Sequence, residues 1–410
     1  MSGVDDSGNN QFPPPSPPAT LSTAASVASV TLGTHSVVQL EAHIRDSKFY
    51  YRDGSTVFLV GNKLFKFQAS LLAADVEDYE LKYIMKDVID GFEGGADKPG
   101  TSDAHPVILP ADITTSQFRD LLMVVFGGIT NYAFLALLKA LQTPSSSSPL
   151  LISRLTNIGY LGCRFGIQRV DAWSQLHIRD SLKTFVATHR LPDNWDAQAI
   201  LRLVRYMQST VVTDYRYEAL YLMRHIISAL VKKAYELNNE IPQGKIIDMC
   251  AALYKEKDTL INSPGFFGFI FAIIVSLGPR SPIWADCLTR EERRVLYVAN
   301  ANLTPLGHAG LEVDWVLNPI RVRQVCSQCS NIFDDSWGGS FSQCGDFKSR
   351  LLSEDIRHVV ALPEYLMQFW SLSGAASCNC ADKMADDIEE RMESLYCGLT
   401  EKYKLLVETV

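Results

Sequence analysis

Residues 56–67 read TVFLVGNKLFKF, which is the pattern of a β-hairpin. Thr56–Val60 and Lys63–Phe67 are rich in β-branched and aromatic residues, which fit a pleated, half-buried surface. Gly61 and Asn62 stand between them, and these residue types accept the positive φ angles of a two-residue hairpin turn. We therefore expect two antiparallel strands here, joined by a tight turn.

The segments around this hairpin predict a small α/β unit. Ordered structure should begin near Arg45, and the apolar run Ser47–Tyr51 leads toward the hairpin. After the hairpin a helix should start within Ala69–Ala74. A loop rich in Gly, Asp, Pro and Ser is expected over residues 91–105, and Pro106–Leu109 then reads as a third short strand.

An amphipathic helix is expected next, over Ser116–Phe126. Thr114 or Thr115 can cap its N-terminus. Its apolar residues recur at the spacing of one helical face: Phe118, Leu121, Leu122 and Val125. The residues expected to bury one face of the whole unit are Phe65, Phe67, Leu71, Leu72, Phe118 and Leu122.

Helical periodicity dominates the rest of the sequence. Helices are expected over residues 132–141, 150–158, 170–186, 197–208, 215–237, 245–254 and 290–300. Thr289 and Glu292 form a capping box at the start of the last of these. No charged residue occurs between Thr259 and Pro279, but the strongly apolar part spans only about a dozen residues, and a membrane-spanning helix needs about 20. We therefore expect a buried core helix there, with membrane contact as the alternative.

Residues 381–410 predict an acidic amphipathic helix. Its apolar stripe consists of Met384, Ile388, Met392, Leu395 and Leu399. Its solvated face should consist of Asp386, Asp387, Glu389, Glu390 and Glu393. We expect this helix to pack on its own domain, and docking to a partner is the alternative.

The stretch from Lys48 to Gly128 resembles the BTB/POZ domain, especially the divergent form common in fungal proteins. The family pattern has a hairpin ending in Phe-x-x-His, an apolar segment, a further strand and a helix containing Phe-x-x-Leu-Leu. The positions that carry the resemblance here are Phe65, Phe67, Gln68, Leu71, Leu72, Leu109, Phe118 and Leu122. Gln68, Val76 and Phe126 replace the family's His, Ser and Tyr, so three polar side chains of the pattern are lost. Residues 155–166 resemble the helix pair that follows BTB domains.

The resemblance implies an α+β fold, with a BTB/POZ N-terminal domain of short strands and helices followed by a mostly α-helical C-terminal region. The organisation that we expect is a disordered Pro/Ser/Thr-rich tail over residues 1–44, the BTB/POZ domain over 45–142, post-BTB helices over 143–190, a helical domain over 191–325 and a Cys-bearing helical segment over 326–410.

The same resemblance implies association with other proteins. BTB domains form homodimers or heterodimers, and many of them bridge substrates to cullin-type ubiquitin ligases. We therefore predict a protein-interaction adaptor that dimerises through its BTB domain and links substrates to such a ligase. A dimeric scaffold or transcriptional regulator without a ligase role is the alternative, and a membrane-associated interaction protein is a third hypothesis.

A set of cysteines near the C-terminus is the one candidate metal site. Cys326 and Cys329 form a CxxC pair, and Cys378 and Cys380 form a CxC pair. Thiolates at such spacing can bind one tetrahedral zinc ion, which would be the only cofactor. The alternatives are that these cysteines are reduced thiols that pack as small apolar groups, or that they have a redox role.

Composition and motifs point away from catalysis and from nucleic acid. The net charge of −8 argues against a broad phosphate-binding surface. The sequence has no HExxH, Walker loop or GxSxG, and we interpret Gly159, Gly162 and Gly166 as positions of helix packing or turns, so no enzyme is predicted. No signal peptide is recognised in the first residues, so we expect a cytoplasmic or nuclear protein with reduced cysteines.

Overall fold

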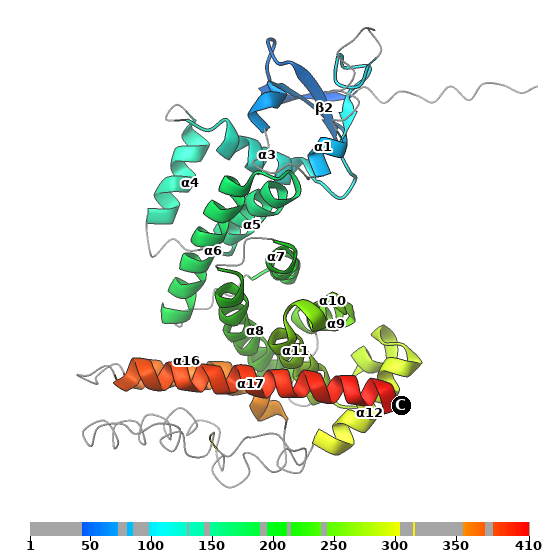
Figure 1. The fold of residues 1–410 in the computed structure, drawn as a ribbon, viewed down its shortest axis with the longest axis vertical. Helices are drawn as coiled ribbons and strands as arrows, with labels where there is room; N and C mark the ends of the chain where they lie inside the picture. Colours follow the sequence, from blue (N-terminus) through cyan, green and yellow to red (C-terminus); the bar gives the residue numbers. More distant parts are fainter. Residues whose placement is uncertain are drawn as a thin grey trace, which may run out of the picture. The chain divides into compact units, whose positions relative to one another are not determined.

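The chain is mixed α/β and mostly helical, with one four-stranded sheet in its N-terminal part (Figure 1). The computed structural model describes residues 43–72, 80–84, 98–128, 131–142, 148–188, 195–210, 215–238, 244–303, 315, 356–373 and 380–409. These residues belong to one compact unit, His43–Val410. The predicted tail lies outside the described residues, apart from its last two positions.

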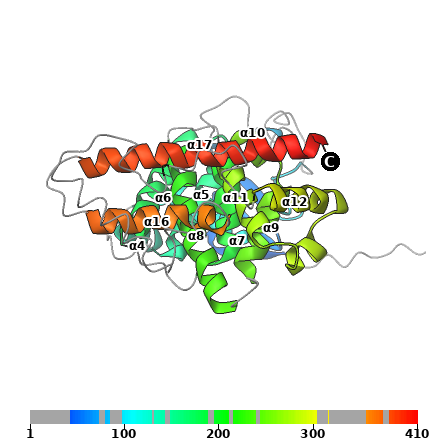
Figure 2. The same cartoon turned by 90° about the horizontal axis from the view of Figure 1, so that it is seen from below.

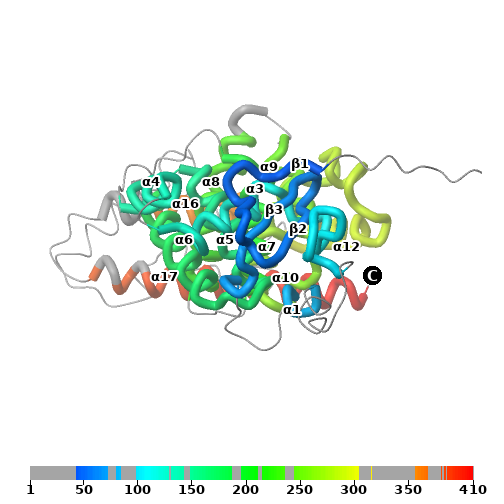
Figure 3. Tube along the Cα trace, turned by 90° about the horizontal axis from the view of Figure 1, so that it is seen from above, coloured from blue at the N-terminus to red at the C-terminus, as the bar shows by residue number. Residues whose placement is uncertain are grey.

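The sheet contains the predicted hairpin at its centre. Its strands are β1 (Ile44–Tyr50), β2 (Thr56–Val60), β3 (Lys63–Phe67) and β4 (Val107–Ile108), in the order β1-β3-β2-β4. β2 and β3 are antiparallel, which confirms the hairpin, whereas β1 is parallel to β3 and β4 is parallel to β2. Gly61 takes a φ of 58° in the connecting turn, as the tight turn requires. The strands β1, β3 and β2 lie next to one another in Figure 3.

Strand β1 is irregular, and a buried aspartate explains why. Its register with β3 shifts between Arg45 and Tyr50. Asp46 Oδ1 accepts hydrogen bonds from the backbone N–H groups of Lys48 at 2.9 Å and Phe49 at 3.0 Å. Its Oδ2 accepts from Arg119 Nε at 2.7 Å. Burial alone would raise the pKa of Asp46, but these partners lower it overall.

The described elements around the sheet are η1 (Ala69–Leu72), α1 (Glu80–Ile84) and α3 (Thr115–Val125), and α4 (Tyr132–Gln142) follows α3 and contacts it. Thr114 caps α3, and Gln117 completes a capping box, so the predicted helix start is confirmed. Phe118 of α3 meets Phe65 of the hairpin edge to face, with ring centroids 5.0 Å apart. Helix α3 thus buries its apolar face against the sheet.

Helices form the rest of the described structure. They are α5 (Pro149–Arg164), α6 (Gln168–Thr188), α7 (Ala197–Ser209), α8 (Arg216–Asn238), α9 (Lys245–Lys255), α10 (Asp258–Asn262), α11 (Pro264–Ser276), a π-helical turn (Ile283–Cys287), α12 (Arg290–Leu303), α16 (Arg357–Ser373) and α17 (Cys380–Thr409). The helices expected from periodicity are therefore confirmed, and α5 extends six residues beyond its predicted end at residue 158. The capping box of Thr289 and Glu292 is present, with the two reciprocal hydrogen bonds at 2.9 and 3.2 Å.

Two glycines let the helices around α5 approach closely. A Cβ on Gly159 would lie 2.2 Å from the Tyr206 hydroxyl, and one on Gly162 would lie 3.1 Å from the backbone nitrogen of Asp171. Gly166 follows α5 with a φ of 71°. The interpretation of these glycines as positions of helix packing and of a turn is confirmed. The same approach lets the Tyr206 hydroxyl donate a hydrogen bond to the buried carboxylate of Asp171.

Helix α11 is the buried core helix that the uncharged segment predicts. All its residues from Gly265 to Val275 are buried. Among the described helices, none is long and apolar enough to cross a membrane. Helix α17 packs along α11, and the predicted apolar stripe of α17 is buried there: Met384, Ile388, Met392, Leu395 and Leu399. The prediction that this helix packs on its own domain is therefore confirmed, and Figure 2 shows it running alongside α16.

Near a proline inside α16, two backbone carbonyl groups accept hydrogen bonds from side chains of neighbouring helices. Pro363 has no N–H group, so the carbonyl oxygen of Val359 loses its partner within the helix. The Tyr396 hydroxyl of α17 donates to this carbonyl at 2.8 Å. His225 of α8 donates through Nδ1 to the Pro363 carbonyl at 2.6 Å. Burial lowers the pKa of His225 to about 3, so this imidazole is neutral.

Candidate functional site

Six of the eight residues that carry the BTB resemblance are core residues. Phe65, Phe67, Phe118 and Leu122 are fully buried, and Leu72 and Leu109 are nearly so. Aromatic contacts hold this core together, since Phe58 stacks on Phe67 with ring centroids 4.9 Å apart. These side chains form the packed core of the N-terminal part, and they present no reactive group.

Two residues of the same motif lie at the surface instead. The prediction that Leu71 is buried is wrong, because its side chain is 55% exposed. Ala69–Leu72 is a single 3₁₀ turn, and its three residues per turn place Leu71 and Leu72 about 120° apart. Leu72 therefore reaches the core and Leu71 does not. Gln68 is also exposed, whereas Val76 lies outside the described residues.

The proposed zinc ligands lie largely outside the described residues. Cys326, Cys329 and Cys378 are not described, and Cys380 is the half-buried first residue of α17. No group of three or more His, Cys, Asp or Glu is placed to hold a metal ion in the part of the chain that the structure describes. The zinc site therefore stays a prediction.

Helix α4 packs one apolar face on the core and leaves two large apolar side chains exposed on its outer face. Its sequence is YAFLALLKALQ, with Lys139 as the only charged residue. Of its eleven residues only Leu137 is buried. Tyr132 is 85% exposed and Leu135 is 41% exposed. An amphipathic helix of a soluble protein normally turns such residues inward, so this face indicates an interaction surface.

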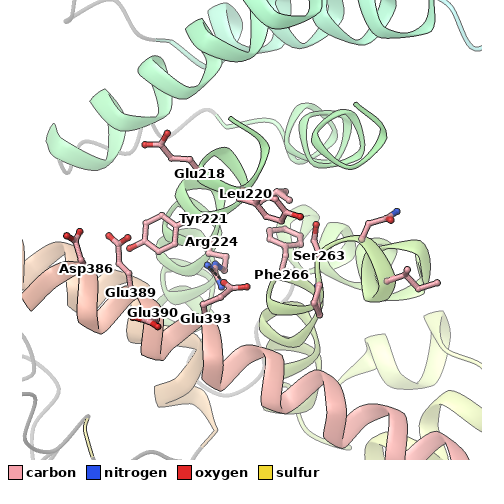
Figure 4. A pocket seen from close by; sticks show the side chains of 14 residues that line it. Glu218, Leu220, Tyr221, Arg224, Ser263, Phe266, Asp386, Glu389, Glu390 and Glu393 are labelled. Carbon is pink, nitrogen blue, oxygen red and sulfur yellow. Dashed lines mark ion pairs between the residues drawn. The ribbon is translucent and has the colours of Figure 1, made fainter. Parts of the chain in front are cut away.

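A second feature is a pocket enclosed by α8, the α10–α11 junction and α17 (Figure 4). It has a volume of about 760 Å³, which is within the range of ligand-binding pockets. Its lining residues are Tyr217, Glu218, Leu220, Tyr221, Arg224, Ile261, Asn262, Ser263, Pro264, Phe266, Asp386, Glu389, Glu390 and Glu393. Five of them are acidic and one is basic. Figure 4 shows Asp386 and Glu389 pointing from α17 toward α8, while Leu220 and Phe266 lie on the opposite side of the pocket.

The single cation of this pocket is deeply buried. Arg224 is 3% exposed, and its Nη2 lies 2.6 Å from Glu393 Oε2. The guanidinium carbon lies 5.2 Å from the ring centroids of both Tyr221 and Tyr396. Its Nε and Nη1 have no hydrogen-bond partner among the described residues. A Cβ on Gly265 would lie 1.9 Å from Glu393 Oε1, so a larger residue there would displace this carboxylate from its present position.

The acidic side of the pocket carries uncompensated charge. Glu218 pairs with Lys183 at 2.5 Å, but Asp386, Glu389 and Glu390 form no ion pair with any described residue. Burial raises the pKa of Glu389 to about 7, and the neighbouring carboxylates of Asp386 and Glu218 add to this rise. The Tyr221 hydroxyl and Arg224 act in the opposite direction.

The predicted solvated face of α17 is therefore only partly correct. Asp386, Glu390 and Glu393 are exposed, whereas Asp387 and Glu389 are half-buried. Glu393, although exposed, forms the ion pair with buried Arg224. The sequence contained one signal of this arrangement, since Arg224 occupies an apolar helical face, four residues after Leu220.

Comparison with known proteins found no matching family model, no matching curated protein and no matching solved structure.

Proposed function

We propose that the chain is a protein-interaction adaptor, and that residues 45–142 form a BTB/POZ-like domain through which it associates. The sequence resemblance supports this proposal. So does the order of elements, because hairpin, strand and helix occur as that resemblance implies, with β4 parallel to β2. Gln68, at a departure from the family pattern, lies on the surface.

Helix α4 is the observation that carries the proposal. Its outer face exposes Tyr132 and Leu135 and carries no carboxylate, so the apolar side chains of two copies can meet there across a two-fold axis. A two-fold interface brings the same patch of each subunit together, and such an interface requires a surface that is complementary to itself. We therefore assign α4 to the contact between two copies of this chain. A cullin-type ubiquitin ligase is the partner that the adaptor would engage through the same N-terminal part.

The apolar stretch that suggested a membrane-associated role is buried within the protein. That hypothesis rested on the apolar stretch from Phe266 to Leu277. This stretch forms α11 and the residue after it, and it is buried among other helices. The need to bury apolar surface within the protein explains its composition.

The test is the mass of the full chain by light scattering after size exclusion, with and without a cullin N-terminal domain. The wild-type chain should be a dimer at micromolar concentration and should form a species that contains the cullin domain. Leu135→Glu puts a charge on the exposed face of α4 and should shift the chain toward monomer. Leu405→Glu is the matched control, because Leu405 is 54% exposed on α17, away from α4 in sequence.

The outcomes separate the hypotheses. A dimer that ignores the cullin domain leaves the scaffold or regulator as the function and removes the ligase role. A monomer at all concentrations that also ignores the cullin domain refutes the adaptor proposal. Equal dimerisation of both variants would show that α4 is not the contact.

A further inference from the structure

The pocket between α8, α10–α11 and α17 has no part in the proposed association through α4. We propose that it binds a short peptide segment that carries a Lys or Arg side chain next to an apolar side chain. This inference is independent of how the N-terminal part associates, because none of the lining residues belongs to residues 45–142.

Charge is the first argument. Of the six charged lining residues, Arg224 and Glu393 neutralise each other, and Glu218 is paired with Lys183 outside the pocket. Asp386, Glu389 and Glu390 remain without a counter-charge among the described residues. Carboxylates that face one another in a partly desolvated site are relieved by a bound cation. An anionic ligand would instead be repelled.

Arg224 supplies the second, independent argument. Its side chain is almost completely buried and lines the pocket, yet Nε and Nη1 donate to no described residue. Buried N–H groups without an acceptor are costly, and a ligand oxygen that reaches Nε or Nη1 when the surrounding side chains shift would remove this cost. A ligand carboxylate or phosphate would be repelled by the carboxylates of Asp386, Glu389 and Glu390. A peptide carbonyl is an uncharged acceptor, and a peptide can offer it together with a basic side chain.

The apolar residues that line the pocket support a peptide ligand rather than a small cation. The side away from the acids is apolar, with Leu220, Phe266 and Pro264 among its lining residues. Tyr217 and Ile261 also line the pocket and are 66% and 77% exposed. A bound apolar side chain would cover them. The ligand would thus place its basic group toward Asp386 and Glu389 and its apolar group toward Phe266.

The direct test is a positional-scanning array of acetylated, amidated pentapeptides probed with the full-length chain. Peptides with Lys or Arg adjacent to Leu, Ile or Phe should be enriched. The strongest peptide is then titrated by calorimetry, beside a version in which citrulline replaces Arg or norleucine replaces Lys. We expect at least a tenfold loss of affinity for the neutral peptide. Enrichment of acidic peptides, or no preference at all, would overturn the proposal.

Variants locate the binding. The double change Asp386→Asn and Glu389→Gln should weaken the peptide at least tenfold. The control is Glu408→Gln, which removes one exposed charge from the far end of the same helix and should leave the affinity unchanged. Equal affinity of the double variant and the control would place the peptide elsewhere and contradict the proposal. Spermidine provides the remaining comparison, because a polyamine that binds as tightly as the peptide would show that charge alone is recognised.

The pH dependence of binding gives a readout that general unfolding would not produce. The groups that face Glu389 are Glu218, Tyr221 and Arg224 on α8, and Asp386, Glu390 and Glu393 on α17. The peptide cation favours the ionised carboxylate, so affinity should rise with pH as Glu389 loses its proton near pH 7. If only the ionised form binds, the affinity changes roughly tenfold between about pH 6 and about pH 8. Glu389→Gln should remove this dependence, and a variant that keeps it would contradict the assignment.

Discussion

Replacing Gly268 by Ala tests the packing of α17 on α11. An ideal Cβ at this position would lie 1.8 Å from the carbonyl oxygen of Tyr396 and 2.9 Å from Thr400 Oγ1. The closest atom belongs to the backbone of a long helix, so no side-chain rotation can relieve the contact. Helix α17 must move away, by roughly 1 Å or more in a tightly packed interior. The hydrogen bond from Thr400 Oγ1 to the Pro264 carbonyl, at 2.6 Å, would be stretched in the same movement.

The expected cost follows from two opposing effects. Overpacking of a core costs about 1–3 kcal/mol, and a backbone obstacle places this substitution near the upper limit. The change from Gly to Ala inside a helix returns about 1 kcal/mol through helix propensity. We therefore expect the free energy of unfolding to fall by about 2 kcal/mol.

Urea unfolding followed by far-ultraviolet circular dichroism measures this change. Gly128→Ala is the matched control, because no atom lies within 4 Å of the Cβ it would add. The control should unfold at the midpoint of the wild-type chain. A Gly268→Ala protein as stable as the control, or more stable, would refute the close approach of α11 and α17.

Three further predictions follow from buried polar groups and caps. Burial raises the pKa of Asp171 despite its hydrogen bonds from Tyr206, Gln175 and Thr210, so its folded state holds the proton more tightly than the unfolded state. The stability of the wild-type chain relative to Asp171→Asn should therefore be highest below about pH 4 and should be lost as pH rises through the folded pKa, and urea midpoints across pH check this. Glu393→Gln should lower the thermal midpoint more than Arg224→Met. The first variant leaves the buried Arg224 cation without its counter-charge, whereas the second removes the cation. Calorimetry of both variants measures the two midpoints, and the reverse order would contradict this reasoning. Thr114→Ala should cost about 1 kcal/mol in urea unfolding through loss of the α3 cap, and an unchanged midpoint would show that this cap does not contribute to stability.

Local patterns in the sequence predicted the local structure well. The turn residues Gly61 and Asn62 fixed the hairpin, and the periodicity of the later segments fixed their helices. The absence of charge over residues 265–275 correctly predicted burial on all sides of α11. These features depend on neighbours within a few residues, and the side-chain pattern records such neighbours directly.

Contacts between distant segments could not be predicted in the same way. The parallel pairing of β1 with β3, and the hydrogen bond between Asp46 and Arg119, which are 73 residues apart, both join segments that no local pattern links. The pocket joins residues near 220, 263 and 390. The apolar stripe of α17 indicated which face is buried, but not that the edge of that face would meet Arg224. Only the tertiary arrangement distinguishes a solvated glutamate from one beside a buried arginine.

The pairing of α11 with α17 has a consequence for protein synthesis. The ribosome makes α11 more than 100 residues before α17, and at about 5–20 residues per second the delay is roughly 5–25 s. During that time the side of α11 that later meets Tyr396, Thr400 and Tyr403 has no covering helix. A nascent chain in this state exposes a continuous apolar surface, which is the kind of surface that chaperones bind and that promotes aggregation. Slow translation of the segment between the two helices should therefore lower the yield of folded protein, even though the amino-acid sequence stays the same.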